Sequence, residues 1–180
     1  MKTRWVIYSL LGFMVIPLRV GHSESLAEWL TREGGSPPAI THFFASEKLS
    51  HNDKWKIYFE ANDPDGDMRQ IVVMVNGGRS RSRFNYVRIK KGDQASLLGY
   101  LNCFIWSGIG AQRNEWAEIT LTLFIRDKGG NTSNRVVFPL ALSQGFKQGI
   151  PPPPFETGKL NALGTIWVDL AIRHPGRDGD

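Results

Sequence analysis

Three aspartates occupy alternate positions in one short turn sequence. Asp63, Asp65 and Asp67 lie in the stretch DPDGD, so three carboxylates fall within five residues. Hard cations such as Ca²⁺ take several oxygen ligands from a tight turn, and a cation would relieve the repulsion between the carboxylates. The same stretch also makes a turn without any ion, because Pro suits the second turn position and Gly supplies a positive φ. Both interpretations stay open, but an EF-hand is excluded, because Met74 stands where that loop needs Glu.

A second group of charged residues is basic. Between Met68 and Gly92 there is no acid, and the candidate anion-binding residues of this segment are Arg79, Arg81, Arg83, Arg88, Lys90 and Lys91. Guanidinium groups at alternate positions of an extended backbone point to one side and suit phosphate, sulfate or carboxylate groups. The alternative is a solvated hairpin whose charges protect an exposed sheet edge from aggregation.

Residue patterns typical of catalysis are not found in the sequence. It contains no Gly-x-Ser-x-Gly, no His-Glu-x-x-His and no phosphate-binding glycine loop, and its four histidines are scattered. The single cysteine, Cys103, excludes a disulfide framework and a Cys-based zinc site. Its apolar surroundings indicate a buried, inert thiol, with a reactive or intermolecular thiol as the alternative. We therefore expect a protein that is not an enzyme.

The first 25 residues have the pattern of a secretory signal peptide. Lys2 and Arg4 precede an uncharged run over residues 5–18, and small residues suited to cleavage follow. The run is shorter than the roughly 20 residues that a membrane-crossing helix needs. We therefore expect an exported protein, in the periplasm, at the cell surface or secreted, with no transmembrane segment in the mature chain.

The rest of the chain reads mainly as short strands. Apolar residues recur at every second position, as in Trp55, Ile57 and Phe59, which is typical of half-buried strands. Turn sequences rich in Gly, Asn and Asp separate these segments. About seven strands are predicted, at residues 39–45, 55–62, 71–75, 86–90, 96–104, 117–126 and 136–142. Such a series predicts an antiparallel sandwich of two sheets.

Two motifs resemble bacterial cadherin-like and immunoglobulin-like extracellular modules. Residues 59–67, FEANDPDGD, resemble the A-x-D-P-D-G-D stretch of such modules, and residues 123–133, LFIRDKGGNTS, resemble the turn between their last two strands. The resemblance covers residues 37–143 and implies an all-β, immunoglobulin-like sandwich. The loops that hold the two motifs lie at the same end of such a sandwich. We therefore expect Asp127 and Asn131 to approach the three aspartates and to complete a Ca²⁺ site.

The C-terminal part differs in composition. Residues 144–158 form a spacer rich in Gly and Pro, and its four consecutive prolines favour an extended polyproline conformation. Residues 159–180 contain a further alternating strand and a polar tail. A lone strand must pair with something. It either returns to an edge of its own sandwich, or residues 165–172 add to the sheet of a partner by strand augmentation.

Two tryptophans, Trp106 and Trp116, flank a connection that contains glycine. We expect them to be core or lid residues, with stacking on sugar rings as the alternative.

These patterns together predict a non-catalytic interaction or structural module of a bacterial envelope or secreted assembly. Its partner is expected to be an envelope or extracellular protein, and its aspartate-rich loop end to be stiffened by Ca²⁺. The alternative is a module that binds an acidic glycan or another anionic polymer through the arginine-rich hairpin, without a specific nucleic-acid partner. The hairpin is expected at the end opposite the aspartates, which would make the molecule electrically polar.

Overall fold

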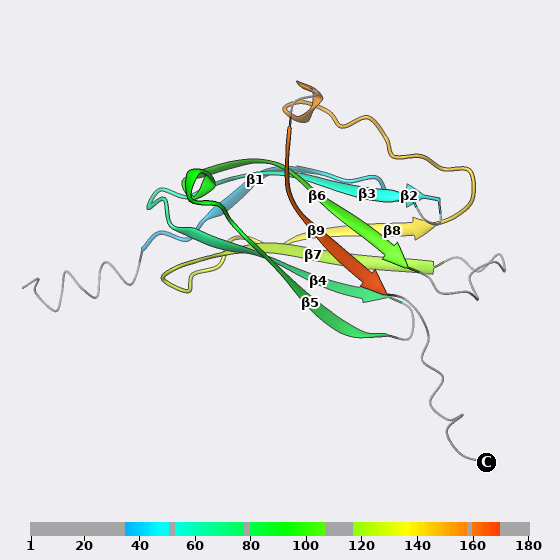
Figure 1. Cartoon of the computed structure of the whole chain (residues 1–180), viewed down its shortest axis with the longest axis horizontal. Coiled ribbons are helices and arrows are strands. Elements are labelled where there is room, and N and C mark those ends of the chain that lie inside the picture. The colour runs from blue at the N-terminus through cyan, green and yellow to red at the C-terminus, as the bar shows by residue number, and fades with distance from the viewer. Residues whose placement is uncertain (1–34, 51–52, 78–79, 107–116, 158–159, 170–180) are drawn as a thin grey trace, which may run out of the picture.

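The structure, a computed structural model, describes residues 35–50, 53–77, 80–106, 117–157 and 160–169. These residues form nine strands and two short 3₁₀ turns (Figure 1). In chain order they are β1 (Ala39–Phe44), β2 (Lys48–Leu49), β3 (Lys54–Asn62), β4 (Met68–Gly77), β5 (Ser80–Arg88), η1 (Lys91–Asp93), β6 (Ser96–Trp106), β7 (Ala117–Asp127), β8 (Val136–Leu142), η2 (Phe155–Thr157) and β9 (Asn161–Asp169).

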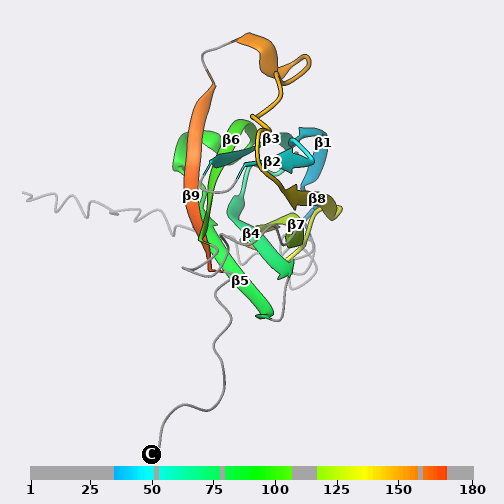
Figure 2. The same ribbon diagram turned by 90° about the vertical axis from the view of Figure 1, so that its right-hand side faces the viewer.

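The strands form two sheets that pack face to face, so the predicted all-β sandwich is confirmed. One sheet has the order β1-β3-β6-β9 and the other β2-β8-β7-β4-β5. Figure 2 shows the two layers, with β9 running along the side of the sandwich next to β6. All pairs are antiparallel except β2–β8 and β6–β9, which are parallel. Strand β9, the last of the described strands, occupies the edge of its sheet beside β6.

The core lies between the sheets and is built from the alternating residues. Trp55, Ile57 and Phe59 of β3 are fully buried, and they face the buried side chains Leu121 and Leu123 of β7. Removing an aliphatic or aromatic side chain of this size from water stabilises the fold by about 1.5–3 kcal/mol. This gain fixes which face of each strand points inward.

Strand β4 is covered on both faces, as its nearly continuous apolar sequence predicts. Ile71 and Val73 belong to the core, and Val72 on the outer face is also buried. Val72 pairs with Phe124 of β7, whose ring lies under the guanidinium group of Arg135 at 5.4 Å. The side chains of Phe124 and Arg135 beside Val72 therefore explain why an outward position of this strand is also apolar.

The sequence analysis missed or shortened several strands. Strand β2 has two residues, too few for any period to be visible, and β5 begins at Ser80, whereas the expected strand began at residue 86. Because β5 is the outer strand of its sheet, its first half carries arginines and no apolar period.

The Gly/Pro spacer is docked on the sandwich and does not extend freely from it. The side chain of Gln148 accepts a hydrogen bond from Lys56 N at 2.8 Å and donates one to Lys56 O at 3.1 Å. Further along, Phe155 of η2 is buried against Tyr58, with ring centroids 5.7 Å apart. The spacer thus leads the chain from β8 across the outer face of the β1-β3-β6-β9 sheet to β9.

Strand β9 pairs with β6 of its own sheet, which answers the question that the sequence left open. Residues 161–169 are strand residues of the sandwich, so the sandwich extends beyond residue 143. The suggested augmentation of a partner's sheet by residues 165–172 is therefore not what the structure shows for 165–169. Residues 170–172 lie outside the described part of the chain.

Two glycines let β9 approach its neighbours. A Cβ at Gly164 would lie 2.4 Å from Cγ1 of Val87 in β5, and a Cβ at Gly99 would lie 2.5 Å from the carbonyl oxygen of Asn161. Real Cβ contacts are not that short, so larger residues would push β9 outward. The contact between Gly164 and Val87 brings the outer strands of the two sheets together along this side of the sandwich.

Some predicted features lie outside the described residues. The signal peptide at 1–25, Arg79, Trp116 and the polar tail at 174–180 belong to this group. Within the residues that are described, there is no helix of the length and apolar character required to cross a membrane.

Candidate functional site

The carboxylate of Asp63 organises the turn between β3 and β4. Asp63 is 3% exposed, and its two oxygens accept hydrogen bonds from the backbone N–H groups of Asp65 and Asp67, both at 3.1 Å. Gly66 completes the turn with φ of 68°. Asp65 is exposed and accepts a hydrogen bond from the backbone of Ser36. This arrangement is the turn chemistry that the sequence offered as its simpler interpretation.

A second aspartate organises the turn between β7 and β8. Asp127 is 2% exposed, and it accepts hydrogen bonds from Asn131 N at 2.7 Å and from Asn131 Nδ2 at 2.8 Å. Lys128 N donates to the carbonyl oxygen of Asp67 at 3.2 Å, so the two turns are joined. The expectation that both turns lie at one end of the sandwich is confirmed.

Asp67 lies nearest the centre of this acidic end. Burial raises its pKa, and the charges of Asp127 and Asp63 raise it further, while Lys128 acts in the opposite direction. Its Oδ1 atom is buried and has no hydrogen-bond partner among the described residues. Nevertheless, no group of three or more His, Cys, Asp or Glu side chains in the described ranges is arranged to hold a metal ion. The Ca²⁺ site formed by Asp63, Asp65, Asp67, Asp127 and Asn131 therefore stays a prediction.

The five described residues among the six predicted to bind an anion do not form one cluster. Arg81 and Arg83 lie in the first half of β5, toward the β4–β5 hairpin, where Arg83 pairs with Val75. Arg88, Lys90 and Lys91 are exposed at the other end, because β5 runs back antiparallel to β4. The expected separation of a basic end from an acidic end is therefore wrong for these three residues. They lie at the end of the aspartate turns, where Asp63 N bonds to the carbonyl oxygen of Ala95 just after η1.

The most exposed tryptophan that the structure describes stands on the outer face of the β1-β3-β6-β9 sheet. Trp167 of β9 is 70% exposed, and its ring stacks on Phe104 of β6 with centroids 4.7 Å apart and an angle of 17° between the planes. Lys54 of β3 places its Nζ 5.5 Å from the centroid of the Phe104 ring. We call Lys54, Phe104 and Trp167 the Trp167 platform.

The strand register explains the platform. Lys54 pairs with Phe104, and Phe104 pairs with Trp167, so the three side chains form one row across three strands. Two rows further along the same face, Tyr58 pairs with Tyr100, and Lys56 from the row between places its Nζ 4.8 Å from the Tyr100 centroid. Phe155 of the spacer covers Tyr58, whereas Trp167 remains open to solvent. The spacer therefore leaves an aromatic surface with two lysines uncovered on this face.

An apolar groove of about 530 Å³ lies at the opposite side of the sandwich, along β1 and β8. It includes the exposed side chains of Phe43, Val137 and Phe146. Phe43 meets Phe138 edge to face at 5.9 Å, and Lys48 Nζ lies 5.4 Å from the Phe146 centroid. Nothing in the structure indicates what would cover this groove.

The described residues include one cysteine and one histidine, the side chains that most often act as nucleophile or base in catalysis. Cys103 is fully buried, and burial raises the pKa of its thiol to about 12, so the thiolate is not formed near neutral pH. The prediction of a buried thiol is confirmed. His42 is the one histidine in the described part of the chain, and its Nδ1 lies 2.7 Å from Oε2 of Glu60 on the outer surface.

The sequence analysis did not select Trp167. It singled out Trp106 and Trp116, of which Trp116 is outside the described residues and Trp106 is placed only by its backbone at the end of β6. A signal was nevertheless present. Ile166 and Val168 occupy the apolar parity of an alternating strand and are buried, so Trp167 falls on the polar parity. A tryptophan on the solvent side of a strand is a candidate for binding.

Comparison of the chain with models of protein families and with curated protein sequences gave no match.

Proposed function

We propose that this chain is a non-catalytic interaction module of a bacterial envelope or secreted assembly, which binds an acidic surface of a partner protein through the Trp167 platform. The single observation that supports this proposal is the exposure of Trp167, stacked on Phe104, on the outer face of a sheet. A ring of this size left in water is unusual, because Trp is highly buried on average in folded proteins. Stacking on Phe104 holds the ring in one orientation, so little side-chain freedom is lost on binding.

The composition of the platform fits a protein interface. Trp and Tyr are among the residues that contribute most to binding energy at interfaces, where their large area is removed from water. Lys54 and Lys56 lie beside the rings of Phe104 and Tyr100, so positive charge borders the aromatic surface. A partner that carries carboxylates around an apolar patch would be complementary in both respects.

The proposal is tested by affinity capture from an envelope fraction, followed by binding of the purified partner. Trp167→Ala removes the stacked ring, and Tyr86→Ala is the matched control, because Tyr86 is 61% exposed but lies on β5 of the other sheet. We expect a partner that binds the wild type and the control equally and binds Trp167→Ala about tenfold more weakly or worse. Equal binding to all three proteins, or no partner for the wild type, would contradict the proposal.

Export is a separate part of the proposal, supported by the residue pattern of the first 25 positions. Expression of the full chain in a bacterium, with N-terminal sequencing of the product, tests it. We expect a chain that lacks the first 25 residues or so and is found outside the cytoplasm. An intact N-terminus on a cytoplasmic product would show that the segment does not direct export.

A second candidate function is binding of an anionic polymer, which the exposure of Arg88, Lys90 and Lys91 favours. The repeated sulfate or carboxylate groups of an acidic polymer attract such residues, and salt weakens this attraction. The test is retention on a heparin column for the wild type and for the Arg88→Glu/Lys91→Glu double variant, with Lys54→Glu as the control on the other sheet. If the double variant elutes at lower salt than the wild type and Lys54→Glu does not, the result supports binding of an anionic polymer. If the double variant is retained like the wild type, this candidate function is removed.

A further inference from the structure

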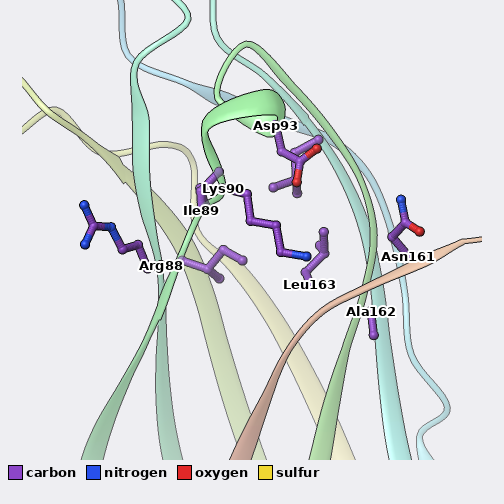
Figure 3. A pocket seen from close by; sticks show the side chains of 9 residues that line it. Arg88, Ile89, Lys90, Asp93, Asn161, Ala162 and Leu163 are labelled. Carbon is purple, nitrogen blue, oxygen red and sulfur yellow. The ribbon is translucent and has the colours of Figure 1, made fainter.

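A cavity opens where the two sheets separate above the contact between Gly164 and Val87. Below this point, β9 and β5 touch and close the side of the sandwich. Above it, β5 continues into η1 and β9 has only begun, so a space of about 300 Å³ remains between residues 88–93 and 161–163. Figure 3 shows this cavity, with the start of β9 on one side and the end of β5 with η1 on the other. Its volume is at the lower end of the range of about 300–1,000 Å³ found for small-molecule sites.

The floor of the cavity is apolar and belongs to the core. Ile71, Ile89 and Leu97 line it, and all three are members of the buried core cluster. Leu163 of β9 forms the facing wall and packs against the same cluster. A ligand in the cavity would therefore remove an aliphatic group from water, which contributes about 0.8 kcal/mol per methylene.

The polar groups of the cavity are at its opening. Lys90 extends across the space with its ammonium end toward Leu163, while the guanidinium group of Arg88 points away (Figure 3). Asp93 of η1 lies at one side of the opening, and Asn161 at the start of β9 lies at the other side. Among the described residues, the Lys90 ammonium group has neither a hydrogen bond nor an ion pair within reach.

We propose that this cavity binds a small monocarboxylate with a short aliphatic chain, with the carboxylate on Lys90 and the chain on the floor of Ile71 and Leu97. The Lys90 ammonium group lies at the opening of the cavity, next to its apolar floor, where it can pair with one carboxylate. The Asp93 carboxylate at the same opening repels anions, so it disfavours a dianion more than a monoanion. This binding is separate from the partner binding proposed for the Trp167 platform.

The probe is octanoate, measured below its micellar concentration by isothermal titration calorimetry with the mature chain. The matched variants are Lys90→Gln, which removes the charge in the cavity, and Lys91→Gln, which removes a neighbouring exposed charge that does not line it. Lys90→Arg keeps the charge, and 1-octanol is the probe without a carboxylate. Both lysines are exposed, so the variants are expected to fold, and circular dichroism with thermal melting confirms this before titration.

We expect octanoate to bind the wild type and Lys91→Gln equally, to bind Lys90→Gln at least tenfold more weakly, and to regain most of its affinity in Lys90→Arg. We also expect 1-octanol to bind at least tenfold more weakly than octanoate. The proposal is overturned if octanoate does not bind at millimolar concentration, or if Lys90→Gln binds it as well as the wild type does. Loss of partner capture in Trp167→Ala with unchanged octanoate binding would separate the two sites.

Discussion

The carboxylate of Asp63 and the ring of Trp167 both stand out by residue type, yet the fold uses them in different ways. Asp63 is buried, and each of its oxygens accepts a hydrogen bond from the turn that follows it. Trp167 contacts Phe104 on one side and is otherwise in solvent. The carboxylate of Asp63 is therefore used by its own turn, whereas the ring of Trp167 is open to a ligand. Side chains that the fold does not use for its own contacts are therefore the better candidates for ligand binding.

The largest effect is expected from a substitution that displaces β9, which carries Trp167, and leaves the aspartate turns unchanged. Gly164→Val would place side-chain atoms where Val87 already lies, 2.4 Å from the new Cβ. We expect a destabilisation of about 1–3 kcal/mol, seen as a melting temperature lower by about 2–4 °C for each kcal/mol. Loss of β9 also removes Trp167 from the sheet, so partner capture fails as well.

The control for this variant is Gly92→Ala. A Cβ at Gly92 meets nothing within 4 Å. We therefore expect the free energy of unfolding of Gly92→Ala to stay within about 0.5 kcal/mol of the wild-type value. Limited proteolysis adds a second measurement, since release of β9 exposes the spacer to cleavage. If Gly164→Val melted and resisted proteolysis like the wild type, β9 would not be held by the contact with β5.

The aspartate end should be broken by removing its central acceptor. In Asp63→Ala, the backbone N–H groups of Asp65 and Asp67 lose their partners, and leaving such groups unsatisfied costs about 1–3 kcal/mol. We expect a corresponding fall in the free energy of unfolding measured with urea. Asp63→Asn keeps one acceptor oxygen, so its free energy of unfolding should lie between those of the wild type and Asp63→Ala. The exposed Asp65→Ala is the control, and a fall as large as that of Asp63→Ala would mean that turn geometry is not what Asp63 provides.

The same contrast explains how much of the molecule was predictable. The strands β3, β7 and β8 were expected because one buried face imposes a period of two, and the convergence of Asp63 with Asp127 followed from loops that share an end of a sandwich. Both inferences need only local pattern and a fold class. The Asp63 turn itself was also visible, because its hydrogen bonds join residues two and four apart in sequence.

The parts that were not predictable depend on long-range pairing. Nothing local states that β9 lies parallel to β6, or that Gln148 satisfies the backbone of Lys56 across 92 residues. The basic residues were grouped as one hairpin because the length of β5 was unknown, and a strand of nine residues carries Arg88 to the end opposite Arg81. The cavity beside Lys90 follows from the same two facts, the length of β5 and the place of β9.

A milder change sharpens the comparison through pH. Burial and the carboxylates of Asp127 and Asp63 raise the pKa of Asp67 above its ordinary value of 3.8. The folded state therefore holds the proton more tightly than the unfolded state. Stability is lost as the pH rises from the unfolded pKa through the folded pKa, and the loss is complete above the folded pKa. Asp67→Asn, which carries no charge, should be more stable than the wild type at pH 7. The difference should shrink as the pH falls and vanish near pH 3.8.

We expect the gain at pH 7 to be no more than a few degrees in melting temperature, because Asp67 is partly exposed and solvent screens its charge. Melting curves of both proteins from pH 3.5 to pH 8 give the measurement, with Asp65→Asn as the exposed control. A stability difference that did not change with pH would show that the carboxylate charge of Asp67 is not its cause.

The smallest expected effect concerns Ca²⁺. The oxygens of Asp63 and Asp127 already accept hydrogen bonds within their own turns, and the carboxylates of the described residues are not arranged around a common point. We therefore expect millimolar CaCl₂ to raise the melting temperature by less than about 2 °C, equivalent to less than 1 kcal/mol. A larger rise that EGTA reverses and that Asp67→Asn lacks would establish the predicted ion site. It would also mean that the acidic end, like the platform, keeps groups free for a ligand.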